Sequence, residues 1–315
     1  MAAVKRACRK SNAEAAPRHC FGAHLSIAGG MHRAIRAALQ MRLDTVQVFV
    51  KNQRQWKATP LRPEDLRRWH ELRTTPGFGP PIAHATYLIN LATADRALHT
   101  RSREALAEEL QRCQTLAIPY LVVHPGAAGP QPRERAITRV AAALDRIFQD
   151  HPHLTTMPLL ETTAGQGTAL GVRFEELGQI IRSVRRPDHV GVCIDTCHVF
   201  AAGYDLRRPD QYEAMIAAAQ REVGLKRIRC WHLNDSRAAC GAHRDRHAHI
   251  GRGQIGSRGF CHILSDPRFV GIPMILETPK GTNERGRDWD RVNVQRLRTI
   301  AARAAPWPTR RRSRR

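Results

Sequence analysis

The feature that most constrains the fold of this 315-residue chain is a regular alternation of short apolar runs with longer amphipathic stretches. The runs are rich in β-branched residues and indicate buried strands, because parallel strands covered on both faces are almost continuously apolar. They cover residues 20–27, 45–50, 81–86, 120–126, 157–162, 189–195, 227–235 and 272–278. Helical spacing is clearest in residues 95–117, 132–148 and 173–183. Eight strand–helix units of this kind predict an α/β fold, a single (β/α)₈ TIM barrel.

A doubly wound open sheet is the alternative architecture for strands that alternate with helices. That fold is marked by a GxGxxG turn after its first strand, whereas this chain has Ser26-Ile-Ala-Gly-Gly30, a helix-opening turn without the fingerprint. We therefore expect one barrel domain over residues 20–305. Residues 1–19 and the Arg-rich residues 306–315 combine charge and proline with little apolar content, which predicts disordered arms.

The chain is strongly basic, since 51 Lys and Arg residues against 28 Asp and Glu residues give a net charge of +23. The two ends contribute part of this charge, but the body between them still carries +14. A body of this charge indicates a polyanionic partner, most simply nucleic acid, although an Arg-rich composition would also inflate surface charge. Mean hydropathy is −0.45, and the apolar runs are too short for a membrane span.

Cysteine usage and the first twenty residues bear on the compartment. Eight scattered cysteines predict reduced thiols in an intracellular protein rather than a disulfide scaffold, and Cys193 is expected to pack in the core. The first twenty residues are basic but have no apolar stretch, so we expect no secretory signal, with a transit peptide as the alternative. We expect a cytoplasmic protein that associates with DNA; organellar or nuclear targeting by the arms stays open.

Titratable side chains recur at or just beyond the ends of the predicted strands. In a barrel the C-terminal ends of all strands open on one face, so these side chains would converge there. A lone histidine on an apolar strand is usually a hydrogen-bonded core residue, but many His, Asp and Glu side chains buried together are very costly without compensation. The nine residues are His84, His124, Glu161, Asp195, His198, His232, Asp245, His247 and Glu277.

Metal coordination would remove that cost. One divalent ion takes about four to six donors, so nine candidate ligands suit two or three ions. Imidazoles and carboxylates without a thiolate suit zinc or manganese, and the five imidazoles favour zinc. Asp245 and His247 are two residues apart, so in an extended segment they point to the same side and can hold one ion together. Neighbouring metals suit in-line attack on a phosphodiester, which together with the basic charge indicates nucleic-acid hydrolysis.

Several segments together resemble the endonuclease IV family of metal-dependent apurinic/apyrimidinic DNA endonucleases. The resemblance runs in order through about residues 20 to 300, and its longer motifs are highly specific. The matching segments are GAHLSIAGG (22–30), VQVFVKNQRQW (46–56), HATYLINLA (84–92), VVHPGAAG (122–129), ETTAGQGTALG (161–171), GVCIDTCHVFAAGYDLR (191–207), WHLNDSR (231–237), DRHAHIG (245–251) and MILETP (274–279).

The resemblance implies three zinc ions at the barrel mouth, with Mn²⁺ possible at one or more sites. A hydroxide between the first two metals would attack the phosphate 5′ to an abasic site and leave a 3′-hydroxyl, while the third metal would help neutralise the leaving oxygen. Glu161 as the bridge and Glu277 as a group that orients the nucleophile are the catalytic candidates. By position, the three groups are His84, His124 and Glu161; Glu161, Asp195, His232 and Glu277; and His198, Asp245 and His247. A 3′-phosphatase or 3′-diesterase activity would fit the same site.

The resemblance also implies that loops enter the minor groove of double-stranded DNA and flip the abasic sugar out. Arg54 and Tyr87 match the positions that insert there, and a solvated loop arginine and a core tyrosine are the alternatives. The expected partner is duplex DNA with abasic sites, bound by a monomer. Residues expected to contact phosphate and sugar, which position DNA without reading its sequence, are Lys51, Asn52, Gln53 and Gln55.

Three positions depart from the family pattern: Thr162 stands where Asn is frequent, Arg252 where Glu is frequent, and Ala85 where Asp is frequent. None of them is a ligand in this assignment. His249 is expected to support a metal ligand or to contact a phosphate rather than to bind a metal itself. Two other functions stay open, a divalent-metal sugar isomerase or epimerase and an inert DNA-binding protein on the same scaffold. The basic body and the complete set of nine ligands favour the nuclease.

Overall fold

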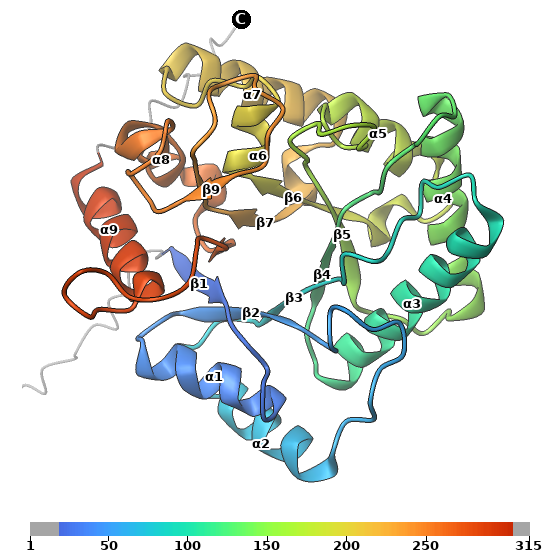
Figure 1. Cartoon of the computed structure of the whole chain (residues 1–315), viewed down its shortest axis with the longest axis horizontal. Coiled ribbons are helices and arrows are strands. Elements are labelled where there is room, and N and C mark those ends of the chain that lie inside the picture. Colours follow the sequence, from blue (N-terminus) through green and yellow to red (C-terminus); the bar gives the residue numbers. More distant parts are fainter. Residues whose placement is uncertain (1–18, 305–315) are drawn as a thin grey trace, which may run out of the picture.

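The computed structural model describes residues 19–304. Within this range, eight parallel strands close into a barrel in the order β1-β10-β7-β6-β5-β4-β3-β2. Helices surround the strands (Figure 1). The predicted (β/α)₈ barrel is therefore confirmed. Its strands are β1 (Cys20–His24), β2 (Thr45–Phe49), β3 (Ile82–His84), β4 (Tyr120–Val123), β5 (Met157–Glu161), β6 (Gly191–Asp195), β7 (Ile228–His232) and β10 (Pro273–Leu276).

The remaining elements are helices, 3-10 turns and one antiparallel hairpin. The helices predicted at 95–117, 132–148 and 173–183 correspond to α3, α4 and α5. The α-helices are α1 (Met31–Gln40), α2 (Pro63–Arg73), α3 (Arg96–Thr115), α4 (Arg133–Asp150), α5 (Phe174–Ser183), α6 (Thr196–Ala201), α7 (Pro209–Glu222), α8 (Gly256–Ser265) and α9 (Trp289–Arg303). The 3-10 turns are η1 (Pro187–His189), η2 (Leu225–Arg227) and η3 (Pro267–Phe269), and the hairpin pairs β8 (Asp235–Ser236) with β9 (His247–Ala248).

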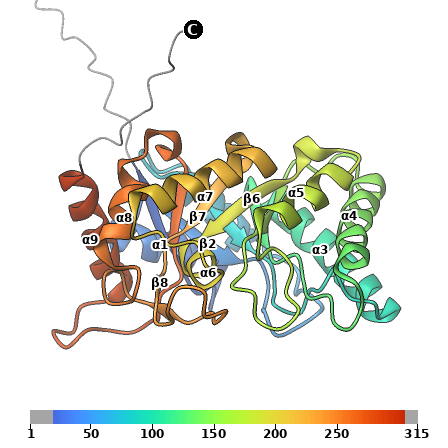
Figure 2. The ribbon, with the colours of Figure 1, turned by 90° about the horizontal axis from the view of Figure 1, so that it is seen from above.

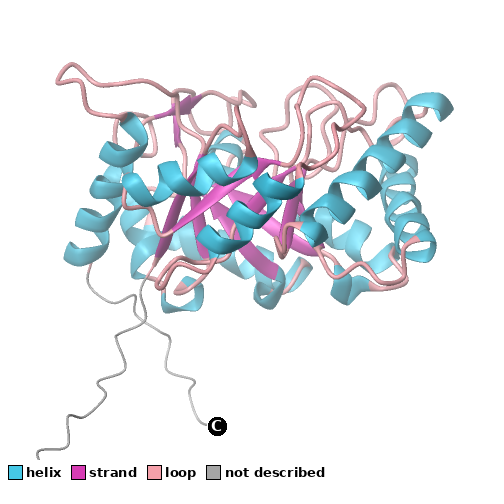
Figure 3. Ribbon diagram, turned by 90° about the horizontal axis from the view of Figure 1, so that it is seen from below, coloured by secondary structure: helices cyan, strands magenta, loops and turns pink. Residues whose placement is uncertain are grey.

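Every barrel strand except β6 ends earlier than the apolar run that predicts it. β4 ends at Val123, because Pro125 has no N–H to donate to a neighbouring strand. β7 ends at His232, and the chain then turns into β8 of the hairpin, which the sequence pattern did not predict. The residues beyond the strands form long loops at one end of the barrel (Figure 3). Figure 2 shows α6 and β8 at this same end.

Side chains of the barrel strands point alternately into the barrel and toward the helices. Gly22 takes the interior position of β1, where a Cβ atom would lie 2.7 Å from the carbonyl oxygen of Thr45 and 2.9 Å from the side chain of Ile275. Only glycine fits at this position. A larger apolar cluster packs between strands and helices. The apolar cluster inside the barrel consists of Ile82, Val122, Leu159, Cys193, Cys230 and Ile275.

The predicted arms, residues 1–19 and 306–315, lie outside the described residues except for His19, whose Nε2 lies 2.9 Å from the carbonyl oxygen of Leu264. Between residues 19 and 304, no helix combines the length and the apolar character needed to cross a membrane. The cysteines of this same range are all free thiols.

The helix that follows β1 depends on a carboxylate from the next helix. α1 begins at Met31 after Gly30, and no side chain of its own caps it. Asp65 of α2 instead accepts hydrogen bonds from the N–H groups of Met31 (2.8 Å) and His32 (3.1 Å) and from His32 Nδ1 (2.6 Å). Burial acts to raise the pKa of Asp65, but these hydrogen bonds outweigh it and hold the pKa below its usual value.

Replacing this carboxylate, Asp65→Asn, should lower the free energy of unfolding by about 1–3 kcal/mol, because buried N–H groups lose a charged acceptor. A group whose pKa is lowered by folding stabilises the protein above its usual pKa of 3.8, and the contribution is lost as the pH falls through the lower pKa of the folded state. Urea unfolding of both proteins from neutral to acidic pH measures this effect. A stability difference that does not shrink in acid would contradict the assignment.

Candidate metal centre

A layer of polar side chains lies directly above the apolar interior of the barrel. Residues two apart on a strand point to the same side, so each interior residue is followed by a second interior-facing position nearer the mouth. In β1 the interior residue Gly22 is followed two residues later by His24, and in β2 Thr45 is followed by Gln47. The positions two residues after the six interior residues are His84, His124, Glu161, Asp195, His232 and Glu277. The barrel thus brings six of the nine candidate ligands together.

The first group of donors joins β3, β4 and β5. His84 Nε2 lies 3.2 Å, and His124 Nε2 2.9 Å, from the same carboxylate oxygen, Oε2 of Glu161. His84 Nδ1 donates to the carbonyl oxygen of Ala85 at 2.7 Å, which turns its Nε2 toward the carboxylate. His84 and Glu161 are buried, whereas the His124 side chain is 36% exposed at the mouth. Three donors therefore face a common point that solvent can reach.

The second group shares Glu161 with the first. Oε1 of Glu161 lies 2.8 Å from His232 Nδ1, and the same nitrogen lies 3.2 Å from Oε2 of Glu277 and 3.9 Å from Oδ2 of Asp195. One donor atom from each of these four residues lies within 4.8 Å of the others. Because the two oxygens of one carboxylate face different groups, Glu161 has the geometry of a bridging ligand.

The third group is assembled by a helix turn and the hairpin. Asp195 caps α6 by accepting a hydrogen bond from the His198 N–H at 3.0 Å, which holds His198 just beyond β6. The pairing of Ser236 in β8 with His247 in β9 carries the DRHAHIG segment back to the mouth. Asp245 lies between two imidazoles, 3.1 Å from His198 Nε2 and 3.0 Å from His247 Nε2. His198, Asp245 and His247 are thereby brought together.

The imidazoles of the third group are oriented for coordination. Nδ1 of His198 donates to the carbonyl oxygen of Thr162 at 2.8 Å, and Nδ1 of His247 donates to that of Glu277 at 2.9 Å. Both rings therefore direct Nε2 toward Asp245. Nε2 of His247 is buried and makes no hydrogen bond, although a carboxylate oxygen of Asp245 lies 3.0 Å away. This orphaned ring nitrogen fits a metal ligand.

Imidazoles and carboxylates balance one another's charge in this cluster. Burial acts to lower the pKa of an imidazole, but the surrounding carboxylates outweigh it and raise the pKa of His198 to about 10 and that of His247 to about 9. Burial acts to raise the pKa values of Glu161 and Glu277, but the facing histidines hold both well below the usual range. These carboxylates, together with the imidazoles in their neutral form, would suit a divalent cation, and binding of such an ion would release the imidazole protons.

Two polar residues at the mouth were missed from the sequence. Gln47 donates from Nε2 to Oε1 of Glu277 at 2.6 Å, and its own Oε1 lies 2.8 Å from Nε2 of His232. His24 Nδ1 lies 3.3 Å from the same Glu277 oxygen. Both hold ligands in place, and the signal for them was present: each is a polar residue inside an apolar strand, two residues after an interior position.

The departures at Thr162 and Ala85 act through hydrogen bonds to the ligands. The Thr162 hydroxyl accepts from the Asp195 N–H at 3.0 Å, in addition to the contact of its carbonyl with His198. Asn234, a further residue that the sequence did not single out, donates to Oδ2 of Asp195 at 2.7 Å. Ala85 supplies its backbone carbonyl to the first group. Thr162, Asn234 and Ala85 therefore support the ligand geometry through these hydrogen bonds.

His249 and Arg252 both contact the indole ring of Trp289. The His249 ring stacks on Trp289 of α9 with ring centroids 3.7 Å apart, and the Arg252 guanidinium lies over the same ring at 4.7 Å. Nδ2 of Asn293 lies 3.1 Å from His249 Nδ1. His249 belongs to none of the three donor groups.

The expectation that Lys51 contacts a phosphate needs correction. Its side chain is only 1% exposed, its ammonium donates to the carbonyl oxygen of Trp56 at 2.7 Å, and Nζ lies 3.3 Å from a carboxylate oxygen of the buried Glu109. Lys51 therefore compensates a buried charge, because Glu109 of α3 packs against this loop. Of its neighbours, Asn52 and Gln55 are exposed and Gln53 is half-buried.

Tyr87 and Arg54 both face solvent. Tyr87 is 65% exposed, and its ring centroid lies 5.7 Å from that of His84 and 6.4 Å from that of His124. This exposure excludes the alternative of a core tyrosine. Arg54 is exposed in the loop after β2, where its N–H donates to Oδ1 of Asn52 at 3.0 Å. A cavity of about 220 Å³ opens beside Tyr87 and His124.

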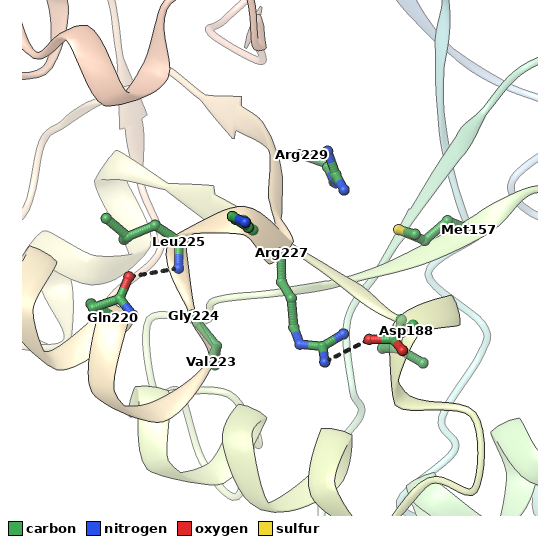
Figure 4. A pocket seen from close by; sticks show the side chains of 10 residues that line it. Met157, Asp188, Gln220, Val223, Gly224, Leu225, Arg227 and Arg229 are labelled. Carbon is green, nitrogen blue, oxygen red and sulfur yellow. Dashed lines mark hydrogen bonds and ion pairs between the residues drawn. The ribbon is translucent and has the colours of Figure 1, made fainter.

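A second cavity, of about 450 Å³, lies at the opposite end of the barrel, where β5 and β7 begin (Figure 4). Arg227 pairs there with Asp188 at 3.0 Å, and Gln220 accepts a hydrogen bond from the Leu225 N–H at 3.3 Å. The residues lining this cavity include none of the nine candidate ligands. The candidate functional site is therefore the mouth formed by the C-terminal strand ends.

A buried carboxylate anchors the loop that follows the third group. Asp235 is fully buried, and both of its oxygens accept hydrogen bonds from backbone N–H groups. These N–H groups, at 2.8–3.3 Å, belong to Ser236, Gly251, Gly253, Ile255 and Gly256. The loop begins directly after the segment that carries Asp245 and His247, so Asp235 ties this segment to the barrel.

The closed barrel with donors at its mouth defines the class of this protein. Residues 35–300 match the family described as xylose isomerase-like TIM barrel. A Chloroflexus aggregans protein named "probable endonuclease 4" is 48% identical over 280 residues, which cover 89% of this chain and 97% of the relative. The crystal structure of endonuclease IV from Thermus thermophilus is 34% identical with a TM-score of 0.79, and the match covers 90% of this chain and 99% of that one. The chain belongs to the endonuclease IV family.

The barrel itself is shared more widely. A D-tagatose 3-epimerase-like protein matches with a TM-score of 0.67 at 18% identity, covering 90% of this chain and 98% of that chain. At this identity the likeness extends to the fold alone. The sugar-converting alternative therefore has a relative in architecture, whereas the closer sequence relatives carry the endonuclease name.

The substitution Asp235→Asn should weaken metal binding at the third group by about 10–100-fold, because the supporting loop loses its charged acceptor. Elemental analysis after dialysis at graded chelator concentrations measures the loss. Asp188→Asn, at an exposed carboxylate of η1, is the matched control and should retain the metal content of the unchanged protein. Equal metal retention in both variants would contradict the role given to Asp235.

Proposed function

We propose that this protein incises double-stranded DNA at abasic sites during base-excision repair. It hydrolyses the phosphodiester on the 5′ side of the lesion and leaves a 3′-hydroxyl. The observation that carries the proposal is the position of Glu161 between two groups of donors, beside a third group, in a chain of the endonuclease IV family. A 3′-phosphatase or 3′-diesterase activity is proposed to accompany incision, because the same donors face the same phosphates.

The donors fit zinc, and we propose three ions per chain, with Mn²⁺ possible at one or more positions. Imidazoles and carboxylates at short separations are typical zinc ligands, and the orphaned Nε2 of His247 agrees with this use. When bound, such ions supply the positive charge and Lewis acidity that in-line hydrolysis of a phosphodiester needs. The residues proposed to hold them are His84, His124 and Glu161; Glu161, Asp195, His232 and Glu277; and His198, Asp245 and His247.

The protein's own residues set the geometry of the reaction. Glu161 faces two groups with its two oxygens, so one carboxylate fixes their spacing. Glu277 is held by Gln47 and His24, and we assign it the role of orienting the attacking water. Asp245 comes from the loop of the hairpin, at the outer side of the cluster, where with His198 and His247 it would hold the third ion. That ion would supply positive charge for the leaving 3′ oxygen.

DNA recognition is assigned to the exposed loops around the mouth. Tyr87 and Arg54 are proposed to enter the minor groove and take the space left when the abasic sugar flips toward the metals. Asn52, Gln53 and Gln55 are proposed to contact phosphate and sugar. Flipping costs little here because an abasic nucleotide has no base to unstack. The net charge of +23 favours a polyanion.

We propose a single catalytic domain over residues 20–305 that acts as a monomer in the cytoplasm, on DNA. For the basic arms at 1–19 and 306–315 three roles stay open: non-specific affinity for DNA, an address, or no function beyond composition. Both arms lie outside the described residues, apart from His19. The alternative, a sugar isomerase or epimerase, shares the barrel. Nine donors exceed what a one- or two-metal isomerase needs, so we prefer the nuclease.

A labelled duplex with one tetrahydrofuran abasic analogue should be nicked to give a 3′-hydroxyl, while an intact duplex and common aldoses stay unchanged. Mild EDTA treatment should spare the reaction, and removal of tightly bound metal should abolish it. Even groups that only support a metal ligand contribute about 10–100-fold, so Glu161→Gln should reduce incision at least 100-fold with the fold retained.

The control for this experiment is Glu134→Gln, at an exposed carboxylate of α4, which should incise like the unchanged protein. Turnover of an aldose without any nick in the abasic duplex would overturn the proposed function. A metal content well below two ions per chain would overturn the three-ion assignment.

Arg54→Ala and Tyr87→Ala should each weaken binding to the abasic duplex by about 10-fold, or ~1.4 kcal/mol, because each removes a large exposed contact. Metal content should stay unchanged, since neither side chain belongs to a donor group. Equilibrium binding with fluorescent duplexes measures the affinity, and Arg146→Ala on α4 serves as the surface control. Unaltered affinity in both variants would remove these residues from the recognition site.

A further inference from the structure

Two cysteines lie directly below the candidate metal centre, in the apolar interior of the barrel. Cys193 of β6 and Cys230 of β7 are Cα partners across the two neighbouring strands. Both are fully buried. Each stands two residues before a candidate ligand, Asp195 and His232 respectively, so each thiol points to the same side as the ligand above it.

The two thiols and the imidazole of His232 form a compact set of donors. Sγ of Cys193, Sγ of Cys230 and a ring nitrogen of His232 lie within 4.8 Å of one another. The Cys230 thiol donates to the carbonyl oxygen of Trp231 at 3.6 Å. Metal–thiolate bonds of about 2.3 Å place two sulfurs roughly 4 Å apart around a shared ion, which this spacing accommodates.

The chemistry of this set differs from that of the mouth. Sulfur donors select soft cations such as Cd²⁺, Hg²⁺ or Cu⁺, whereas carboxylates suit harder ones. The apolar side chains that share the interior cluster with the two thiols are Ile82, Val122, Leu159 and Ile275. We propose that Cys193, Cys230 and His232 form a binding site for a soft, thiophilic cation, distinct from the three groups at the mouth but sharing His232 with the second.

Sharing one imidazole makes the two sites compete. His232 Nδ1 lies 2.8 Å from Glu161 and 3.2 Å from Glu277, and His232 is the one imidazole of the second group. A cation held by the thiols therefore draws His232 away from that group. Each thiol loses a proton to solvent as it becomes a thiolate ligand, and no electron is transferred. Displacement of a metal from the second group rests on the proposed function, whereas binding by the thiols does not.

The test adds cadmium chloride to the full-length protein, purified with its own metals under reducing conditions. A thiolate-to-cadmium charge-transfer band in the ultraviolet is expected, together with release of bound metal to a chromophoric chelator. Cys193→Ala and Cys230→Ala should each weaken the band, and the double variant should lose it. Cys113→Ala, at a fully buried thiol of α3 outside the site, is the matched control and should retain the band.

Cys197 provides the contrasting variant, because its thiol lies within 4.8 Å of donor atoms of Asp195 and His247. A band that survives in the double variant but disappears in Cys197→Ala would overturn the proposal, as would the lack of any band in the unchanged protein. X-ray absorption at the cadmium edge of the unchanged protein is independent of how the variants fold. It should report two sulfur neighbours, and one or none would contradict the site.

Incision assays separate this inference from the proposed function. Cadmium should inhibit incision of the abasic duplex by the unchanged protein and by Cys113→Ala, and should inhibit the double cysteine variant much less. Equal inhibition of all three proteins would overturn the competition for His232. If none of them incises the duplex without cadmium, the proposed function fails, while the charge-transfer band still decides whether the thiols bind the cation.

Discussion

The carboxylate of Glu161 is the charge around which the mouth of the barrel is arranged. It is fully buried at the end of β5, with one oxygen facing His84 and His124 and the other facing His232. A buried carboxylate without compensation costs several kcal/mol, so imidazoles or cations must stand opposite it. The surrounding histidines compensate this charge. The same imidazoles and carboxylates are the donors that would suit a divalent cation. The charge balance at the mouth and the proposed chemistry thus depend on the same carboxylate.

The barrel converts a pattern of period two into a layered site. Apolar side chains fill its interior, and the next position on the same strand is polar: Glu161 follows Leu159, and His232 follows Cys230. Because the strands are parallel, these polar positions all lie toward the same end of the barrel. The apolar layer keeps water from the lower side of the cluster, where electrostatic interactions are consequently stronger than in water. The same layering places two thiols under His232, which is the basis of the soft-cation site.

Much of this arrangement could be predicted from the sequence, because the strands, their common direction and the residue types at their ends depend on local periodicity. Other features could not. Lys51 stands in a polar loop motif, and nothing local reveals that Glu109 of α3 buries it. Each strand of the β8–β9 hairpin is only two residues long, too short to show a periodic pattern in the sequence. The hairpin nevertheless places His247 at the mouth of the barrel. His24 and Gln47 each lie two residues after an interior position of their strand. A single polar residue in an apolar strand was too weak a signal to predict their place in the site.

The order and chemistry of the residues were thus enough to predict the barrel, the polar layer above its core and a set of ligands that suits zinc. Three features depend on the closed barrel. Each oxygen of Glu161 faces a different donor group, Tyr87 is exposed, and Cys193 pairs with Cys230 across neighbouring strands. These outcomes depend on contacts between segments far apart in the chain. The physical reason is that strand tilt and stagger are fixed only when the last strand pairs with the first.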